Sequence, residues 1–461
     1  MPQQILIMDP YHPYAIRFIE RYYRIWGMKS VCFYTDPEQF HYEAWRYPEL
    51  RSEMIEASYA VPRSRVLDLV PILKQKHDIA AVVPHNDLAV VASEELAEAL
   101  GLDWAQPGVI ELFRDKFALK ELLRSLPDAP RINGTARVGS VTEIRASLSD
   151  GRFARFVLKP IDGYGNQNVG FFDDQTSDDE LATYLQAVDR PAVLMEEFLD
   201  GREFWVNGQI DGSGNVTILA VFESLVQDMN GRDNVPVAHP LIHSDDPVFE
   251  PLARYATEVM RASGLKRSPF HMEVIVDEQG PCMVEVGARM MGQHASPEMD
   301  EVHGSDFDVF TLAAHYYLTA EDFGPIDLDW EFYNSREFRI LLGTSSSHDR
   351  IYELNGIAEV GALPEFLHWI DKPFIGQRIV PRTDLFSSPW QAVIAGQSNE
   401  YLDSIEARIR QTIGWNQDAH GAGRAFKKAR AFAAVANRKF HERQKLFGRI
   451  PLQDVPLREH A

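Results

Sequence analysis

The feature that most constrains the fold is a pair of short acidic strands near the middle of the 461-residue chain. Residues 270–276 and 283–289 each alternate apolar side chains with other residues at the period of a β-strand. The turn residues at 277–280 predict that the two strands form a hairpin. Such a hairpin places Glu273 beside Glu285.

Two neighbouring carboxylates repel each other unless a cation lies between them. Hard oxygen ligands of this kind suit Mg²⁺ or Mn²⁺. Arg289 follows on the same predicted face, two pleats beyond Glu285. This pattern is typical of a site that gathers phosphate oxygens and stabilises the negative charge of a reacting acyl group. The alternative is a surface hairpin whose acidic side chains point outward.

A glycine-rich segment upstream favours a phosphate site. Residues 156–160 predict a strand that reaches Lys159, and residues 161–170 form a loop with Gly163 and Gly165 before a second strand at 171–172. Glycines let a backbone approach a ligand and direct N–H groups at phosphate, while a lysine supplies a positive charge. The segment does not match the P-loop pattern. An ordinary turn is the alternative.

Paired acids mark the next strand connection. An apolar strand leads to Glu196 and Glu197, then to Phe198 and Leu199, and a second strand begins near Glu203. The backbone of such a linker can read the edge of a purine, and a carboxylate at the next strand can accept hydrogen bonds from ribose hydroxyls. Solvated hairpin charges are the alternative.

Taken together and in this order, these motifs resemble the ATP-grasp superfamily of carboxylate–amine ligases, most closely its L-amino acid ligase branch. The resemblance covers roughly residues 80–300. It implies that Lys116 and Lys159 are the two nucleotide lysines, that Glu196 faces the adenine amino group and that Glu203 holds the ribose. The residues implied to bind ATP are Lys116, Lys159, Gly163, Tyr164, Gly165, Glu196, Glu197, Phe198, Leu199 and Glu203.

The same resemblance assigns the catalytic groups. Glu273 and Glu285 are implied to bind Mg²⁺ (or Mn²⁺), and Arg289, with Lys159, to act in catalysis by stabilising the charge of the reacting groups. Many members of the superfamily carry asparagine where this chain has Gly287, which weakens the second metal position.

Three residues near the metal strands are expected to contact the substrate: His271, Gly292 and His294. His271 shares the face of Glu273 and is expected to orient that carboxylate or to touch a substrate. A structural hydrogen bond is the alternative role. The polar segment 227–238 is expected to form a loop over the acceptor pocket.

The fold class predicted is α/β. Strands and helices alternate at the start of the chain, as in an open parallel sheet, at residues 5–8, 13–26, 30–34, 79–84 and 88–100. The resemblance implies an ATP-grasp fold with four parts: an N-terminal Rossmann-like preATP domain at 1–110, two αβ subdomains that clasp ATP at 111–205 and 206–330, and a C-terminal αβ extension at 331–461. A helix begins at Lys116, and an amphipathic helix is predicted from about 423 to 446.

Composition limits the partners. The 46 basic and 68 acidic residues give a formal charge of −22, which opposes binding to nucleic acid or to anionic membranes. Two cysteines allow no disulfide framework, and we find no membrane span or signal peptide. We therefore expect a cytoplasmic enzyme that has no nucleic-acid or membrane partner. The resemblance adds a possible homodimer.

The function implied is that of an ADP-forming ligase that uses ATP and Mg²⁺ to join a carboxylate to an amine through an acyl phosphate. Its expected partners are small-molecule substrates, an amino acid and a second amino acid or a small acid, so that a dipeptide or an amide forms. Two alternatives stay open. One is another ATP-grasp chemistry, of the purine or carboxyphosphate type, and the other is a nucleotide-binding regulatory protein without turnover.

Overall fold

The computed structural model describes residues 3–10, 13–36, 53–102, 104–149, 151, 153–163, 165, 168–291, 303, 313, 317–318, 328–385 and 387–416. The chain divides into two compact units. Unit 1 comprises 1–110, 306–322 and 420–461, and unit 2 comprises 111–305 and 323–419. The predicted helix at 423–446 lies outside the described residues.

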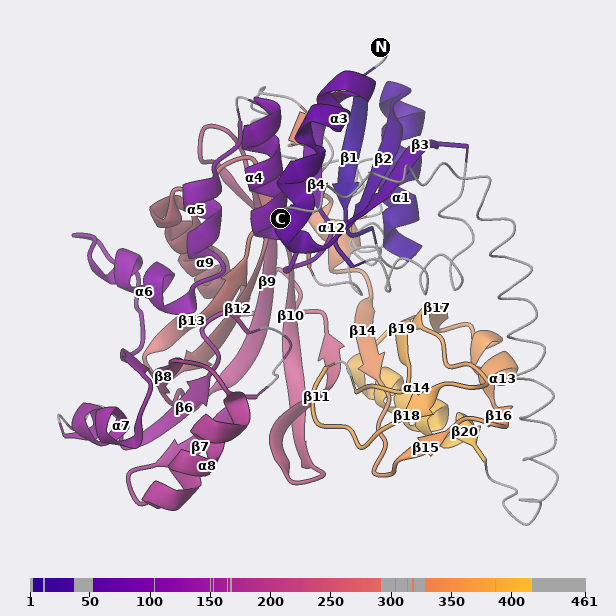
Figure 1. The fold of residues 1–461 in the computed structure, drawn as a ribbon. Helices are drawn as coiled ribbons and strands as arrows, with labels where there is room; N and C mark the ends of the chain where they lie inside the picture. The colour runs from indigo at the N-terminus through magenta and orange to yellow at the C-terminus, as the bar shows by residue number, and fades with distance from the viewer. Residues whose placement is uncertain are drawn as a thin grey trace. The chain divides into compact units, whose positions relative to one another are not determined.

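Unit 1 contains a parallel sheet whose strands lie in the order β3-β2-β1-β4 (Figure 1). Its elements are β1 (Gln3–Met8), α1 (Pro13–Trp26), β2 (Lys29–Tyr34), β3 (Ile55–Ala60), the 3₁₀ helix η2 (Arg63–Leu69), α3 (Val70–Lys76), β4 (Asp78–Pro84) and α4 (Val90–Leu100), with α5 (Pro107–Leu112) at the unit boundary. The predicted α/β start of the chain is therefore confirmed. The predicted helix at 88–100 begins two residues later, at Val90.

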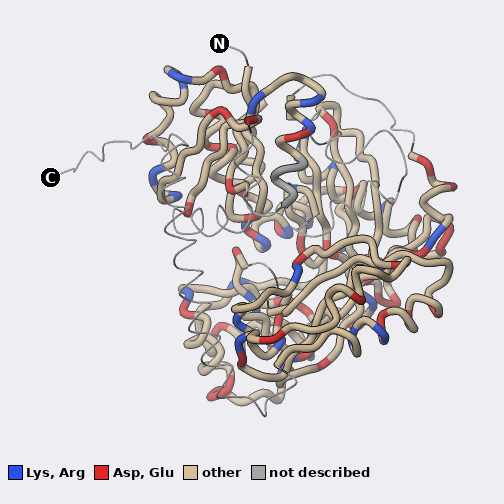
Figure 2. The backbone as a smooth tube through the Cα atoms, turned by 90° about the vertical axis from the view of Figure 1, so that its right-hand side faces the viewer, with Lys and Arg blue, Asp and Glu red and all other residues tan. Residues whose placement is uncertain are grey.

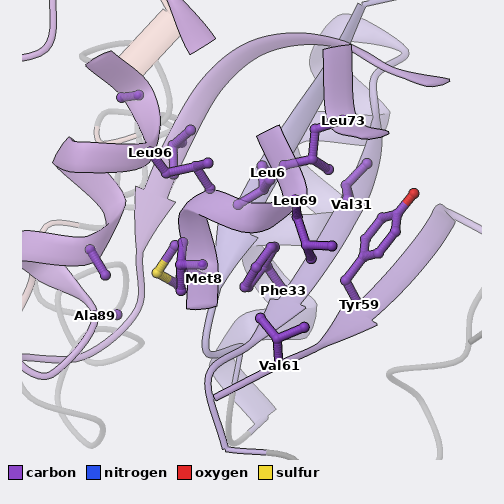
Figure 3. Close-up of a cluster of buried hydrophobic side chains, with 14 of the residues drawn as sticks. Leu6, Met8, Val31, Phe33, Tyr59, Val61, Leu69, Leu73, Ala89 and Leu96 are labelled. Carbon is purple, nitrogen blue, oxygen red and sulfur yellow. The ribbon is translucent and has the colours of Figure 1, made fainter. Parts of the chain in front are cut away.

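The core of unit 1 lies between this sheet and its helices. Figure 3 shows Leu6, Met8, Val31 and Phe33 of the central strands beside Leu69, which comes from η2. Continuous apolar runs of this kind are typical of parallel strands that are covered on both faces.

The described part of unit 2 contains a four-stranded and an eight-stranded antiparallel sheet, with two further sheets of two strands each. The four-stranded sheet (the small sheet) has the order β5-β8-β6-β7, and the eight-stranded sheet (the large sheet) has the order β13-β12-β9-β10-β11-β14-β19-β17. The elements up to the end of the central hairpin are α6 (Lys116–Arg124), β5 (Thr135–Val138), α7 (Val141–Leu148), β6 (Arg155–Lys159), β7 (Gly170–Asp173), α8 (Asp178–Val188), β8 (Val193–Glu197), β9 (Arg202–Ile210), β10 (Val216–Met229), β11 (Arg232–Pro240), α9 (Phe249–Ser263), β12 (Ser268–Asp277) and β13 (Gly280–Gly287).

Among the remaining elements of unit 2, β14, β19 and β17 extend the large sheet, while β15 pairs with β18 and β16 with β20. The remaining elements are α12 (Trp330–Tyr333), β14 (Glu337–Leu342), β15 (Asp349–Arg350), β16 (Leu354–Asn355), α13 (Ile357–Gly361), β17 (Phe366–Asp371), β18 (Arg378–Ile379), β19 (Gln391–Gly396), α14 (Asn399–Thr412) and β20 (Gly414–Trp415). Because β14 pairs with β11, the sheet continues across residue 330. The four predicted domain ranges stay a prediction.

Helices cover the small and the large sheet of unit 2. Ile144 of α7 and Leu181 of α8 pack into one cluster with Phe156 of β6 and Met195 of β8. On the large sheet, α9 packs against β9, β10 and β13, and α14 packs against β14 and β19 (Figure 1). Figure 2 shows acidic and basic residues interspersed along the described backbone.

The expectation that residues 227–238 form a loop is wrong. These residues belong to a long hairpin in which Gln227 pairs with Val235 and Met229 with Arg232. Asn230 and Gly231 make the turn with φ of 53° and 74°. Two positive φ values are typical of the tight turn that an Asn-Gly pair favours, so the turn chemistry outweighed the polar composition of the segment.

A buried carboxyl group in unit 1 predicts an unusual pH dependence of stability. Glu94 of α4 is 6% exposed, and its Oε2 accepts a hydrogen bond of 2.9 Å from the backbone N–H of Gln106. Burial raises the pKa of Glu94 to about 7, and that hydrogen bond only partly opposes the rise. Because the folded pKa lies above the unfolded pKa, the folded state is more stable below about pH 4.5, and that stability is lost as the pH rises through 7.

We therefore expect Glu94→Gln to remove this loss. The free energy of unfolding of the variant, relative to the wild type, should be greater at pH 8 than at pH 5 by up to about 3 kcal/mol. Urea unfolding at the two pH values measures this difference. An equal difference at both would contradict the assignment of a raised pKa to Glu94.

Candidate active site

A cleft of about 860 Å³ in unit 2 collects most of the predicted site residues. The predicted residues that line it are Lys116, Lys159, Gly163, Gly165, Glu196, Glu197, Phe198, Leu199, Glu203, Glu273 and Glu285. They come from α6, from strands of the small and the large sheet, and from the connections that follow β6 and β8. Tyr164, Gly292 and His294 lie outside the described residues. The structure thus brings together motifs that are up to 169 positions apart in the chain.

The paired glutamates lie directly opposite each other. In the hairpin of β12 and β13, Glu273 pairs with Glu285, as the sequence predicted. The register then shifts between Glu273 and Val274, which leaves Val284 as the extra residue of a β-bulge. The carbonyl oxygen of Val284 accepts a long hydrogen bond of 3.5 Å from Lys159 Nζ. The bulge therefore directs a backbone oxygen of the hairpin toward the small sheet.

Burial and the repulsion of neighbouring carboxylates disfavour the charged form of Glu273. Burial raises the pKa of Glu273 well above its usual value, and the carboxylates of Glu285 and Glu203 raise it further. The positive charges of Lys159 and Lys116 oppose the rise without cancelling it. The local charge therefore favours an additional cation.

Lys116 connects the hairpin to the glycine loop. It is the first residue of α6, whose N-cap Asp115 accepts a hydrogen bond from the N–H of Ala118. Lys116 Nζ lies 3.0 Å from Glu285 Oε2 and donates a hydrogen bond of 2.5 Å to the carbonyl oxygen of Gly163. One ammonium group thus contacts both the metal-ligand candidate and the phosphate-loop candidate.

Glu196 lies between two buried lysines. Its Oε2 is 2.5 Å from Lys159 Nζ, and its Oε1 pairs with Lys120 Nζ, which also donates a 2.9 Å hydrogen bond to Asn133 Oδ1. Burial alone would raise the pKa of Glu196, but the two lysines outweigh it and lower this pKa to about 2. Burial lowers the pKa of Lys120, and the nearby Glu196 charge opposes that effect.

The pKa of Lys159 is shifted in the opposite direction to that of Lys120. Burial would lower the pKa of Lys159, but the charges of Glu196 and Glu285 outweigh it, so this pKa is raised. Lys159 therefore stays protonated at neutral pH and can act as a fixed positive charge in the cleft.

Glu203 is electrostatically linked to the glutamate pair. Burial raises the pKa of Glu203 to about 7, and the charge of Glu285 contributes to the rise. The nearby polar side chains of Trp205 and Ser224 partly lower the pKa. Ribose hydroxyls are suitable partners for a carboxyl group in this state, because they can donate or accept hydrogen bonds.

Arg289 and His271 are not among the described residues that line the cleft. The predicted strand 283–289 is too long, because β13 ends at Gly287 and a bend follows. Arg289 Nη1 donates a hydrogen bond of 2.8 Å to the carbonyl oxygen of Met290. His271 Nε2 lies 3.9 Å from Glu273 Oε1, as expected for residues on one face. Their proposed roles stay predictions.

Sequence reasoning missed Lys120, which is fully buried. A signal for it was present: Lys116 and Lys120 are four positions apart on α6 and therefore share a helix face. It also missed Ser224, Thr383 and Asp384, which line the cleft. No local motif identifies those residues. Arg232, Asp233 and Asn234 line it as well and belong to the segment 227–238 that was expected over the acceptor pocket.

The donor set fits a divalent cation that is held jointly with a ligand. The described residues contain no group of three or more acidic, histidine or cysteine side chains able to hold a metal ion. Glu273 and Glu285 supply two carboxylates, which suits Mg²⁺ because this ion usually keeps phosphate oxygens and waters as its other ligands.

Comparison with known proteins identifies the domain. Residues 153–298 match the family described as ATP-grasp domain. In sequence, the chain is 29% identical over 231 residues to dapdiamide A synthase of Enterobacter agglomerans, over 47% of this chain and 52% of that protein. The chain thus matches about half the length of this curated relative. Residues 153–298 thus form an ATP-grasp domain, and the predicted resemblance to the ATP-grasp superfamily is confirmed.

Solved structures support the fold. The L-amino acid ligase from Bacillus licheniformis aligns with a TM-score of 0.71 and 18% identity, over 89% of this chain and 98% of that one. The phosphoribosylglycinamide synthetase from Anaerococcus prevotii aligns with a TM-score of 0.65 and 12% identity, over 90% and 99%. The ATP-grasp fold that the sequence predicted is therefore confirmed.

The buried pair of Lys120 and Glu196 should be strongly coupled. We expect a double-mutant cycle of Lys120→Met and Glu196→Gln to give an interaction free energy of at least about 2 kcal/mol, because removing either partner leaves a charge buried. The matched control is Arg124 with Glu121 on the same helix, whose side chains are 37% and 46% exposed. That cycle should give less than about 0.5 kcal/mol. Urea unfolding at pH 7 measures both, and equal coupling in the two cycles would refute this account.

Proposed function

We propose that this protein is an ATP-dependent, ADP-forming ligase that joins a carboxylate to an amine through an acyl phosphate. The observation that carries the proposal is the convergence of Lys116, Lys159, Glu273 and Glu285 in one cleft. Two lysine ammonium groups and two glutamate carboxylates in one cleft suit a bound polyphosphate together with a divalent metal ion.

The chemistry explains why ATP is needed. An ionised carboxylate and an amine do not condense at useful rates in water, because the carboxylate oxygen is a poor leaving group. In the proposed reaction the substrate carboxylate attacks the γ-phosphorus of ATP and ADP leaves. The amine then attacks the acyl phosphate and inorganic phosphate leaves. No covalent protein nucleophile takes part.

The residues of this chain would act by positioning and by charge compensation. Lys116 and Lys159 would contact the phosphates. Glu273 and Glu285 would hold Mg²⁺ or Mn²⁺, which when bound neutralises phosphate charge. Arg289 would stabilise the oxyanion of the tetrahedral adduct.

The nucleoside would lie at the connection of β8 and β9. The backbone of Phe198 and Leu199 would contact the adenine, and Glu203 the ribose. The ion pairs of Glu196 with Lys120 and Lys159 leave lone pairs available, because each carboxylate oxygen can accept two hydrogen bonds. Glu196 can therefore hold both lysines and still accept a hydrogen bond from the adenine amino group.

The substrates are proposed to be amino acids, with a dipeptide or an amide as the product. The similarity to dapdiamide A synthase and the fold shared with an L-amino acid ligase support this choice. Among the described residues, no helix is both long and apolar enough to cross a membrane. A homodimer and a cytoplasmic location stay predictions.

Phosphate release from Mg·ATP, measured with a matrix of amino acid pairs and followed by product masses, tests the function. We expect release that requires both a carboxylate and an amine substrate. Release that depends on bicarbonate or on a ribonucleotide would favour another ATP-grasp chemistry. Nucleotide binding without release for any pair would favour a regulatory protein.

Glu285→Gln should lower metal-dependent turnover by more than about 100-fold, because even groups that only orient metal ligands cost 10- to 100-fold when changed. The matched control is Glu278→Gln, in the exposed turn of the same hairpin, which should keep wild-type turnover. Steady-state phosphate release at saturating Mg²⁺ measures both. Full activity of the Glu285 variant would count against its role as a metal ligand.

Arg289→Ala should suppress amide formation about 100- to 1000-fold, the usual cost of removing an oxyanion donor. Nucleotide affinity should change by less than about threefold, because Arg289 is proposed to act on the tetrahedral adduct and not on the nucleotide. Arg137→Ala, at an exposed position of β5, is the control. A variant that loses nucleotide binding and turnover together would contradict this division of roles.

A further inference from the structure

A second polar cluster lies on the same face of the large sheet as the glutamate pair. Side chains of a strand alternate between faces, so Trp205, Asn207 and Gln209 of β9 share one face with Glu203. Glu273 pairs with Trp205, and His271 pairs with Asn207, which places both β12 side chains on that face. A polar row thus runs along β9, away from the glutamate pair.

The cluster is buried, but much of its hydrogen-bonding capacity is unused. Asn207 is 1% exposed, Gln209 is 0% and His239 of β11 is 1%. Across the described part of the chain, no partner meets hydrogen-bond geometry for Asn207 Nδ2, for Gln209 Oε1 and Nε2, or for either ring nitrogen of His239. The backbone of Glu223 acts to raise the pKa of His239, but it is the smallest of the effects on this pKa.

Leaving such groups unpaired is expensive. An unsatisfied buried donor or acceptor costs about 1–3 kcal/mol, and native proteins contain few of them. Five unpaired atoms on two strands of a single sheet, β9 and β11, which β10 separates, therefore call for a bound partner.

Other contacts hold the cluster in place. His271 Nδ1 and Asn207 Oδ1 are 2.8 Å apart, so the amide of Asn207 is fixed with its Nδ2 available. The ring of Trp205 stacks on His239, with centroids 3.6 Å apart, and meets His271 edge to face at 5.3 Å. The rings and the amide are thereby oriented before any ligand arrives.

The chemistry of the available atoms favours oxygen in the ligand. Asn207, Gln209 and His239 offer three donors and two acceptors, and none of them is acidic. Burial lowers the pKa of His239 well below its usual value, and the nearby charge of Arg382 lowers it further, so this imidazole is neutral. Arg382 is itself fully buried and donates to the carbonyl oxygens of Gly343 and Pro236. A neutral, donor-rich surface beside a buried cation suits a carboxamide or a carboxylate and disfavours an ammonium group.

Strand geometry gives the length of the ligand. Asn207 lies two residues, or about 7 Å, from the position opposite Glu273, and Gln209 lies about 13 Å from it. A molecule whose reacting carboxyl group lies near Glu273 would reach these amides with a second polar group several bonds away.

We propose that Asn207, Gln209 and His239 form a subsite that binds a carboxamide or carboxylate group in one of the ligase substrates. This substrate is therefore an amino acid, or a derivative of one, whose side chain carries a planar oxygen-bearing group. The inference rests on the proposed ligase function and adds the class of substrate to it.

The test uses the full-length protein and compares asparagine, glutamine, aspartate and glutamate with leucine and methionine as substrates. KM should be at least tenfold lower for the polar amino acids than for the apolar ones of similar size, because a site built for hydrogen bonds rejects an analogue that lacks them. Gln209→Leu should reduce the preference for polar over apolar amino acids by at least tenfold, mainly by raising KM for the polar ones. Gln279→Leu, in the exposed turn between β12 and β13, should leave the preference unchanged.

A second variant distinguishes the two ligand groups and guards against misfolding of the first. Gln209→Glu keeps the shape of the side chain and adds a negative charge, so it should weaken the use of aspartate and glutamate by at least tenfold more than the use of asparagine and glutamine. The proposal would be overturned if the wild type showed no preference for polar amino acids, or if the Gln209 variants retained that preference. The unpaired atoms would then be explained by ordered water.

Direct binding separates this proposal from the proposed function. Thermal shifts with the same amino acids are measured on the wild type and on Gln209→Leu without nucleotide. Absence of phosphate release for all pairs would refute the ligase function, while a shift with polar amino acids that the variant loses would still support the subsite. Absence of any such shift in a protein that turns over apolar pairs would refute the subsite alone.

Discussion

The organisation of the site depends on the balance of charge around the carboxylates of Glu273 and Glu285. Burial and mutual repulsion raise the pKa of Glu273, and Lys116 and Lys159 only partly offset the repulsion. Lys116 lies 3.0 Å from Glu285, so the two signs of charge are in direct contact. Such an arrangement is stable as it stands, but it is suited to accept a divalent cation together with an anion that takes over the lysines.

This balance requires a rigid frame, which the small and the large sheet of unit 2 provide. The hairpin of β12 and β13 fixes the glutamates opposite each other, and the bulge at Val284 directs a carbonyl oxygen at Lys159. On the other side, Lys120 and Lys159 hold Glu196, whose pKa falls to about 2. Lys159 thus contacts both the hairpin, at Val284, and the small sheet, at Glu196. A change at either contact alters its electrostatic environment.

The sequence predicted those parts of the site that depend on local periodicity. Glu273 and Glu285 could be paired because strand alternation and a short turn determine the register of a hairpin. The same reasoning located β6, β8 and the start of the parallel sheet of unit 1. It failed at residues 227–238, where the polar composition suggested a loop although the Asn230-Gly231 turn determines a hairpin, and at Arg289, which follows the end of β13.

Other features could not be read from sequence, because they depend on long-range contacts. The sequence indicates that Lys120 shares a helix face with Lys116, but only the folded structure shows that it is buried and paired with Glu196 of β8. Likewise, Asn207, Gln209 and His239 belong to ordinary strands, and their unpaired polar atoms become evident only when burial is known. Both cases concern polar groups inside the protein, for which the tertiary environment decides whether a partner exists.

The most direct test of the central claim is a crystal structure of the full-length protein with Mg²⁺ and a nonhydrolysable ATP analogue. The account predicts metal ions about 2.1 Å from carboxylate oxygens of Glu273 and Glu285, bridging to phosphate oxygens that also contact Lys116 or Lys159. A triphosphate bound elsewhere, with both carboxylates directed to bulk solvent, would contradict it.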